Sequence, residues 1–133
     1  MRVFLDSNVL ISAARFPDSV PYWAVLKAIT EPNECFVCEQ NIEEARKVFS
    51  LKFPNHIEDL ETFLFALFSV AELVPVPKHR IPEEQNVRDL DDRSILRAAI
   101  WARADILVTG DKDFIESQLE SPKCLTPSEF LFI

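Results

Sequence analysis

The fold is decided by residues 105–111, which read Asp-Ile-Leu-Val-Thr-Gly-Asp. The apolar run inside this stretch shows no polar alternation, which is typical of a strand buried on both faces of a parallel sheet. Gly110, the only glycine in the chain, ends this strand. The stretch therefore predicts an α/β fold in which helices cover a mostly parallel sheet and an acid, Asp111, follows the end of a strand.

Strands and helices alternate along the rest of the chain, as expected for a layered α/β fold. The expected strands cover residues 2–6, 35–38, 73–76, 105–109 and a short stretch near Cys124. The expected helices cover 8–15, a segment that Ser19 and Pro21 open, 40–52, 56–69 with Asn55 as its N-cap, 92–104, a weak helix over 113–120, and a last helix from the capping box Thr126–Glu129. Residues 77–90 are expected to form a polar loop.

The composition suits one compact domain over residues 1–133, because 133 residues of which 48% are hydrophobic can bury a real core. No apolar stretch approaches the roughly 20 residues of a membrane span, and the start of the chain lacks a signal-peptide pattern. Three cysteines form an odd set, which favours reduced thiols in a reducing compartment. We therefore expect a cytoplasmic protein without membrane contact.

Two of the cysteines, Cys35 and Cys38, have the C-x-x-C spacing of some zinc sites. They fall in an expected strand, where residues three apart point to opposite faces. Only Cys124, His56 and His79 remain to complete a zinc site, so we interpret these cysteines as buried strand residues.

The chain is acidic, with 22 acids against 14 bases and a formal charge of −8. Nucleic-acid binding normally depends on basic residues. An acidic protein that binds RNA must gather its bases locally or use bound cations to neutralise its own carboxylates; otherwise it binds something else.

Asp6 closes the first predicted strand, and Asp111 follows the apolar strand by two residues. Asp6 is also suited to cap the helix after it, and Asp111 to form a turn with Asp113 or cap the next helix. In a doubly wound sheet the functional crevice lies beyond the carboxyl ends of the strands, where the strand order reverses. If the first and fourth strands flank that point, the two acids face each other across it.

Two helices are expected to contribute further acids from their first turns. Asp92 shares the apolar face of its helix, whereas Asp91 points elsewhere and is expected to cap it. Glu44 lies at the edge of an apolar face, whereas Glu43 points away from it. Each of these acids could also be a solvated helix residue or a favourable charge at a helix start.

Four carboxylates in one crevice repel one another, and some would stay protonated unless cations intervened. Hard oxygen ligands select Mg²⁺ or Mn²⁺, as one ion or two, and phosphodiester hydrolysis is the natural chemistry. Asp113 is the alternative to Asp111 as fourth ligand. Ser7, Asn8 and Thr109 are expected to orient the carboxylates from behind, although they could simply be turn residues.

Four stretches carry a family resemblance. They are Phe-Leu-Asp6-Ser-Asn-Val-Leu, Ile-Glu-Glu44-Ala-Arg-Lys-Val-Phe, Asp-Leu-Asp-Asp92 followed by Ala99, and Leu-Val-Thr-Gly-Asp111-Lys-Asp113-Phe. In this order they resemble the acidic motifs of the PIN domain family, and the resemblance runs from Met1 to about Thr126.

The resemblance implies a three-layer α/β/α sandwich with a parallel sheet of strand order 3-2-1-4-5. It also implies a Mg²⁺- or Mn²⁺-dependent endoribonuclease, often the VapC-like toxin of a toxin–antitoxin pair, and frequent homodimers that pack away from the active centre. Arg15, Arg93 and Lys112 are the candidates for RNA contacts, with Lys78, His79, Arg80 and Arg88 nearby; ordinary surface charge explains each of them equally well.

Two other functions fit parts of the pattern. A non-catalytic PIN-like module could keep the acids and hold a protein or RNA without cleaving it. A Mg²⁺ phosphoryl-transfer enzyme of the phosphatase or receiver kind also has a central aspartate after its first strand, but it predicts a catalytic lysine after a later strand, which suits this order of motifs poorly.

Overall fold

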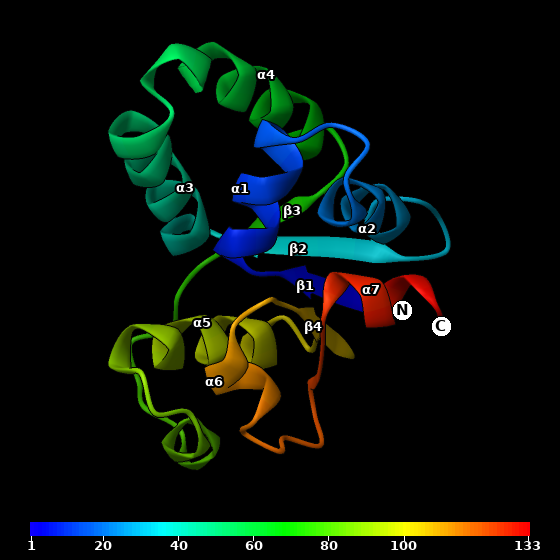
Figure 1. Cartoon of the computed structure of the whole chain (residues 1–133). Coiled ribbons are helices and arrows are strands. Elements are labelled where there is room, and N and C mark those ends of the chain that lie inside the picture. The colour runs from blue at the N-terminus through cyan, green and yellow to red at the C-terminus, as the bar shows by residue number, and fades with distance from the viewer.

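The computed structural model describes residues 1–133 and contains a parallel five-stranded sheet between two layers of helices (Figure 1). The strands are β1 (Arg2–Leu5), β2 (Glu34–Cys38), β3 (Glu72–Val74), β4 (Ile106–Val108) and β5 (Lys123–Leu125). They lie in the order β3-β2-β1-β4-β5, and every neighbouring pair is parallel. This confirms the predicted fold class and strand order, with β1 and β4 side by side at the centre.

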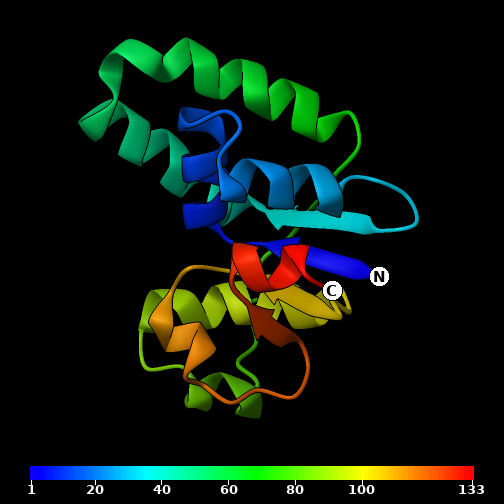
Figure 2. The same cartoon turned by 45° about the vertical axis from the view of Figure 1, so that its right-hand side comes forward.

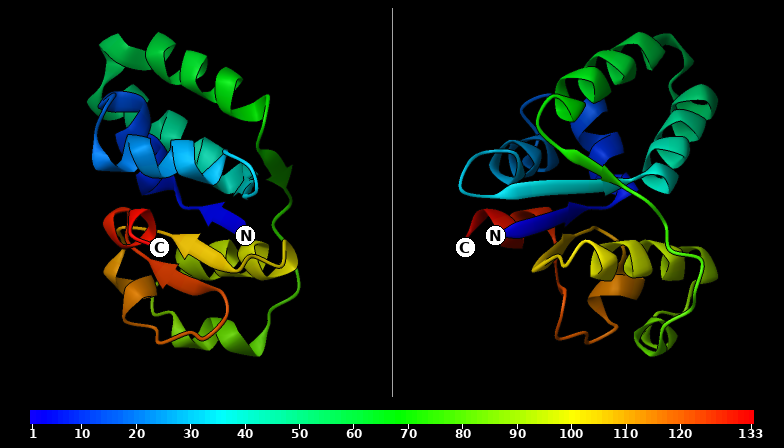
Figure 3. Two further views of the ribbon diagram at one scale, coloured as in Figure 1. Left: turned by 90° about the vertical axis from the view of Figure 1, so that its right-hand side faces the viewer. Right: turned by 180° about the vertical axis from the view of Figure 1, so that it is seen from behind.

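Seven α-helices and two short 3₁₀ helices connect the strands. They are α1 (Ser7–Arg15), α2 (Val20–Ala28), α3 (Glu39–Lys52), η1 (Pro54–His56), α4 (Ile57–Phe68), η2 (Pro82–Asn86), α5 (Leu90–Trp101), α6 (Lys112–Ile115) and α7 (Pro127–Leu131). Figure 2 and Figure 3 show α1 to α4 on one side of the sheet and α5 and α6 on the other. No helix is both long and apolar enough to cross a membrane.

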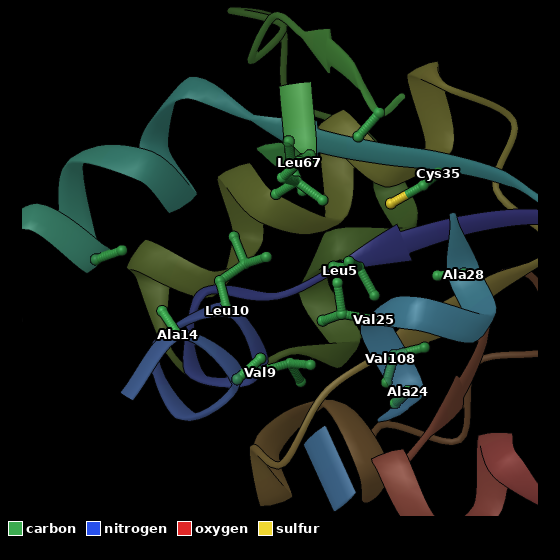
Figure 4. Close-up of a cluster of buried hydrophobic side chains, with 14 of the residues drawn as sticks. Leu5, Val9, Leu10, Ala14, Ala24, Val25, Ala28, Cys35, Leu67 and Val108 are labelled. Atoms are coloured by element: carbon green, nitrogen blue, oxygen red, sulfur yellow. The ribbon is translucent and has the colours of Figure 1, made fainter. Parts of the chain in front are cut away.

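Each face of the sheet has its own hydrophobic core, because alternate strand residues point to opposite sides. Leu5 of β1 packs with Val9 and Leu10 of α1 in the larger core (Figure 4), whereas Phe4 packs with α5 in the smaller one. Cys35 belongs to the larger core and Cys38 to the smaller. The two cysteines are thus buried free thiols on opposite faces, as predicted, and they do not share a metal site.

Several predicted boundaries were wrong. Helix α5 begins at Leu90, and its N-cap is Asp89, whose carboxylate accepts a hydrogen bond from the Asp91 backbone, so Asp91 is not the cap. Residues 54–56 form a 3₁₀ turn, so α4 starts after Asn55 and has no side-chain cap. The helix expected over 113–120 is the single turn α6, and the loop expected over 77–90 contains η2.

Arginines of α5 hold the segment that leads into this helix. The Arg97 guanidinium Nε lies 2.9 Å from Glu84 Oε2, and its Nη1 donates to the carbonyls of Pro77 and Lys78. Arg93 Nε donates to the Val87 carbonyl. These contacts position the first turn of α5, which carries Asp92.

Removing one side of the buried Glu84–Arg97 pair should destabilise the fold, since the remaining charge is left uncompensated. We expect Arg97→Met to lower the free energy of unfolding by about 3 kcal/mol. The exposed Arg46–Glu61 pair, with an N–O distance of 2.9 Å, is the matched control, and Arg46→Met should cost less than about 1 kcal/mol. Urea unfolding measures both. Equal losses would contradict a special role for the buried pair.

Candidate metal centre

Asp6 lies where β1 ends and α1 begins, and its side chain is only 3% exposed. Its carboxylate accepts hydrogen bonds from the Ser7 backbone N–H and the Thr109 hydroxyl, both at 2.8 Å. The amides of Asn8 and Asn41 donate to it at 3.3 and 3.4 Å. One carboxylate thereby joins the end of β1, the end of β4 and the start of α3.

Burial raises the pKa of Asp6 from its ordinary value of 3.8 to about 6. The hydrogen bonds from Thr109 and Ser7 act in the opposite direction, and the negative charges of Glu44 and Asp111 raise the pKa further. Glu44 and Asp111 are therefore close enough to repel Asp6, as their predicted positions required.

Asp92, in the first turn of α5, has an unsatisfied carboxylate. Its Oδ2 atom is buried and has no hydrogen-bond partner. Its pKa is raised, first by burial, then by the neighbouring carboxylate of Asp111 and by the negative charges of Asp6 and Asp89. A buried oxygen that lacks a donor, in a cluster of acids that lacks a lysine or arginine partner for it, fits a ligand of a divalent cation.

Asp111 caps α6, accepting a hydrogen bond of 2.8 Å from the Asp113 backbone N–H. Its own backbone N–H donates to the Thr109 hydroxyl at 3.0 Å. The same hydroxyl donates to Asp6, so Thr109 connects the Asp6 carboxylate to the backbone of Asp111. Asp111 therefore caps α6 and also lies among the acids, two roles that the sequence analysis gave as alternatives.

Glu44 is half-buried on α3 and accepts a hydrogen bond from the Ser7 hydroxyl, whereas Glu43 is exposed. Glu44 raises the pKa of Asp6 but is not among the charges that raise the pKa of Asp92. Glu44 thus acts on Asp6, and both Asp6 and Asp111 act on Asp92; these four acids are here called the acidic row.

A more compact group lies at one end of this row. Ligand atoms of Asp89, Asp92 and Asp113 lie within 4.8 Å of one another. Oxygen ligands of this kind suit Mg²⁺ or Mn²⁺. Asp113 therefore lies beside Asp92 just as Asp111 does, and Asp89 is an acid that the sequence reasoning did not consider. Its position three residues before Asp92 at a helix start was the available signal.

Asn41 is a second residue that the sequence reasoning missed. It is fully buried, its Oδ1 accepts from the Cys38 backbone N–H at 3.2 Å, and its amide donates to Asp6. Its position at the third residue of α3, where a capping side chain often lies, was the only local sign. Ser7, Asn8 and Thr109, which the sequence placed behind the acids, all contact Asp6.

Most of the basic residues considered for RNA contacts in this region already interact with other groups of the protein. The Arg15 guanidinium lies over the rings of Phe16 and Phe53, at 5.0 and 5.3 Å. Arg93 is bonded to the backbone of the segment before α5, and Arg88 pairs with Glu116 and Asp113 at 2.8 and 3.5 Å. Lys112 is exposed at the start of α6 and is in no ion pair.

The raised pKa of Asp6 predicts how the metal-free protein responds to pH. Between about pH 4 and pH 6 the folded protein keeps a proton that the unfolded chain releases, so the free energy of unfolding should fall by up to about 3 kcal/mol as pH rises through this range. Urea unfolding in EDTA from pH 4 to 8 measures this. Asp6→Asn should reduce the fall between pH 4 and 6 and leave the part that is due to Asp92, whose pKa is also raised, and Mg²⁺ should restore stability above pH 6. Parallel curves for the two proteins would contradict the assignment.

Comparisons with known proteins support the fold. The sequence profile of the PIN domain matches residues 2–113. No curated protein matches the sequence. The fold is similar to a chain in the crystal structure of VapBC2 from Rickettsia felis bound to a DNA fragment from their promoter, with a TM-score of 0.69, 18% identity, and coverage of 95% of this chain and 98% of that one. The profile spans Asp6, Glu44, Asp89, Asp92, Asp111 and Asp113, and it covers most of the chain, which therefore belongs to the PIN domain family.

Proposed function

We propose that residues 1–133 form a single nuclease domain that cleaves RNA internally with the help of Mg²⁺ or Mn²⁺. The observation that carries this proposal is the buried Asp92 oxygen, which lacks a donor and lies among acids that raise its pKa. PIN domains are typically nucleases and typically use divalent metals, which supports the same chemistry.

Asp6, Glu44, Asp92 and Asp111 are the proposed metal and catalytic residues, with Asp113 and Asp89 as further ligands. A bound divalent ion supplies positive charge for developing negative charge on a phosphate, and it can lower the pKa of water. The chain itself contributes orientation. Thr109 connects the Asp6 carboxylate to the Asp111 backbone, and Ser7 links Asp6 to Glu44.

The negative charge of the protein makes binding of an RNA backbone costly unless cations are local. Bound ions would offset the acids of the crevice. Lys112 is the cation best placed to meet a phosphate, because it lies between Asp111 and Asp113 in the sequence and is exposed. Arg15 and Arg93 remain candidates, although each already has a partner within the fold.

Cleavage of a single-stranded RNA pool tests the nuclease proposal. Asp92→Asn should lower kcat/KM by at least about 100-fold, more than the loss of a residue that only orients a ligand, and EDTA should abolish the activity. Asp91→Asn, at the exposed neighbouring position, is the matched control and should keep activity. Glu44→Gln and Glu43→Gln form a second matched pair. Cleavage that persists in EDTA would rule out the metal mechanism.

A folded protein that binds Mg²⁺ and RNA but cuts neither RNA nor other phosphodiesters would favour the non-catalytic module. The acids would then serve to hold a ligand rather than to promote hydrolysis. The predicted pH dependence of stability is the same for a nuclease and for a non-catalytic module, because it depends on the protonation of the protein and not on catalysis.

We also propose that the protein is the toxin of a toxin–antitoxin pair and forms homodimers. The similarity to VapBC2 supports a protein partner. An apolar hollow of about 130 Å³ between α2 and α4 adds to this support, since every side chain around it is hydrophobic. It is lined by Tyr22, Val25, Leu26, Ile29, Phe63, Ala66 and Leu67.

Induced expression in a bacterial host tests the toxin proposal. The wild-type protein should arrest growth, whereas Asp92→Asn at the same protein level should not, because arrest depends on RNA cleavage. Asp91→Asn should arrest growth as the wild type does. Equal growth in all three cultures, with full-length protein present by immunoblot, would contradict the toxin role and leave cleavage in vitro to be judged separately.

A further inference from the structure

A cavity of about 370 Å³ lies beside the acidic crevice, on the side of the sheet that carries α1 and α2. Its wall comes from α1, from the starts of α2 and α7, and from the turn after β4. Helices α2 and α7 are neighbours in the fold, with α7 next to α2 in Figure 2. The volume is within the range of roughly 300–1,000 Å³ that small-molecule sites occupy.

Asn8 forms the boundary between this cavity and the acids. Its side-chain amide donates to Asp6 Oδ2 at 3.3 Å, and its Oδ1 accepts from the Gly110 backbone N–H at 3.0 Å. Both Asn8 and Gly110 line the cavity. A substrate whose reacting phosphate lay at the acids would therefore extend into the cavity across this boundary.

Gly110 has no side chain, which leaves space in the cavity wall, and the fold does not require this space. Its φ is not positive, so the backbone conformation is open to other residues. A Cβ added there would meet only Asn8, at 3.6 Å from Oδ1 and 3.9 Å from Cγ, which are ordinary contacts. Neither the backbone conformation nor the packing requires glycine here, and the missing side chain leaves the Gly110 backbone open to a ligand in the cavity.

The chemistry of the wall selects an uncharged ligand. No lysine, arginine, aspartate or glutamate lines the cavity, so a phosphate would find no compensating charge there. Val20, Pro21 and Pro127 offer apolar contact, and the hydroxyls of Ser12 and Ser128 can form hydrogen bonds. This combination suits a base with its ribose, because unpaired RNA bases are recognised by stacking and by hydrogen bonds to their edges.

We infer that this cavity, here called the Gly110 pocket (Asn8, Ser12, Val20, Pro21, Gly110 and Ser128 with their neighbours), binds the nucleoside next to the scissile phosphate and selects its base. This inference rests on the proposed ribonuclease function and adds a specificity-determining site to it. Gly110 and Ser128 are positioned to shape the pocket and take no part in the chemistry.

The test fills the pocket and leaves the acids intact. A single-stranded RNA pool with a random centre is cleaved by the wild type and by Gly110→Ala, Gly110→Leu and Ser128→Trp, and the product ends are sequenced. Ser50→Trp, at an exposed serine toward the far end of α3, is the matched control. Mg²⁺ affinity and melting temperature are measured for each protein.

We expect the wild type to prefer certain bases beside the cut. Gly110→Leu and Ser128→Trp should raise KM at least about tenfold and flatten this preference, while Gly110→Ala should have a smaller effect and Ser50→Trp none. Melting temperature and Mg²⁺ affinity should be unchanged in all of them. If both large substitutions keep the wild-type KM and preference, the inference is overturned while the nuclease proposal stands.

A measurement of RNA binding separates failure of this inference from failure of the nuclease proposal. In the Asp92→Asn background, anisotropy of a labelled single-stranded RNA reports binding without cleavage. If the wild type cuts nothing, weaker RNA binding in Gly110→Leu still supports the pocket, and equal binding overturns it. Absence of RNA binding by every protein also overturns it, and points instead to a protein side chain as occupant.

Discussion

The buried carboxylate of Asp6 is the feature on which the site depends. A carboxylate that is 3% exposed must be compensated, and its donors come from the first turn of α1, the end of β4 and the start of α3. Those hydrogen bonds bring three segments together where the central strands end. Even so, burial and the neighbouring acids keep its pKa high, so the donors do not fully offset the charge. A divalent ion would supply the rest of the compensation, which connects the local packing to the proposed chemistry.

Much of the fold followed from hydrophobic pattern. The apolar runs of β1 and β4 marked buried parallel strands, whereas the strand order came from the family resemblance and not from the residues alone. Helix starts were harder to place. Asp89 and Asp91 are both good caps by residue type, and only the backbone turn before α5 decides that Asp89 accepts the hydrogen bond. The short helix α6 ends at Ile115, and Gln118 takes a positive φ of 56° soon after it; no pattern in the sequence announced either feature.

The acids were easier to find than their surroundings. Asp6 and Asp111 follow strands, and parallel strands bring their carboxyl ends to one edge, so adjacency could be inferred. Asn41 could not, because its importance comes from being buried beside a carboxylate that is 35 positions away. The partners of the arginines were equally hidden. In the sequence Arg93 looked like a surface cation, but its Nε atom donates to the Val87 carbonyl. A long side chain finds such a partner through proximity in the folded structure rather than through local spacing in the sequence.

The central position of β1 has a consequence for how the chain matures on the ribosome. Val3 pairs with Ile106, and Thr109 reaches Asp6 across 103 positions of sequence. The innermost strand is therefore made early but gains its second neighbour only after most of the polypeptide has been synthesised. Until then Asp6 lacks Thr109 and Asp111, and no complete acidic crevice exists. In a growing chain with this topology, the acids therefore come together only when translation is nearly finished.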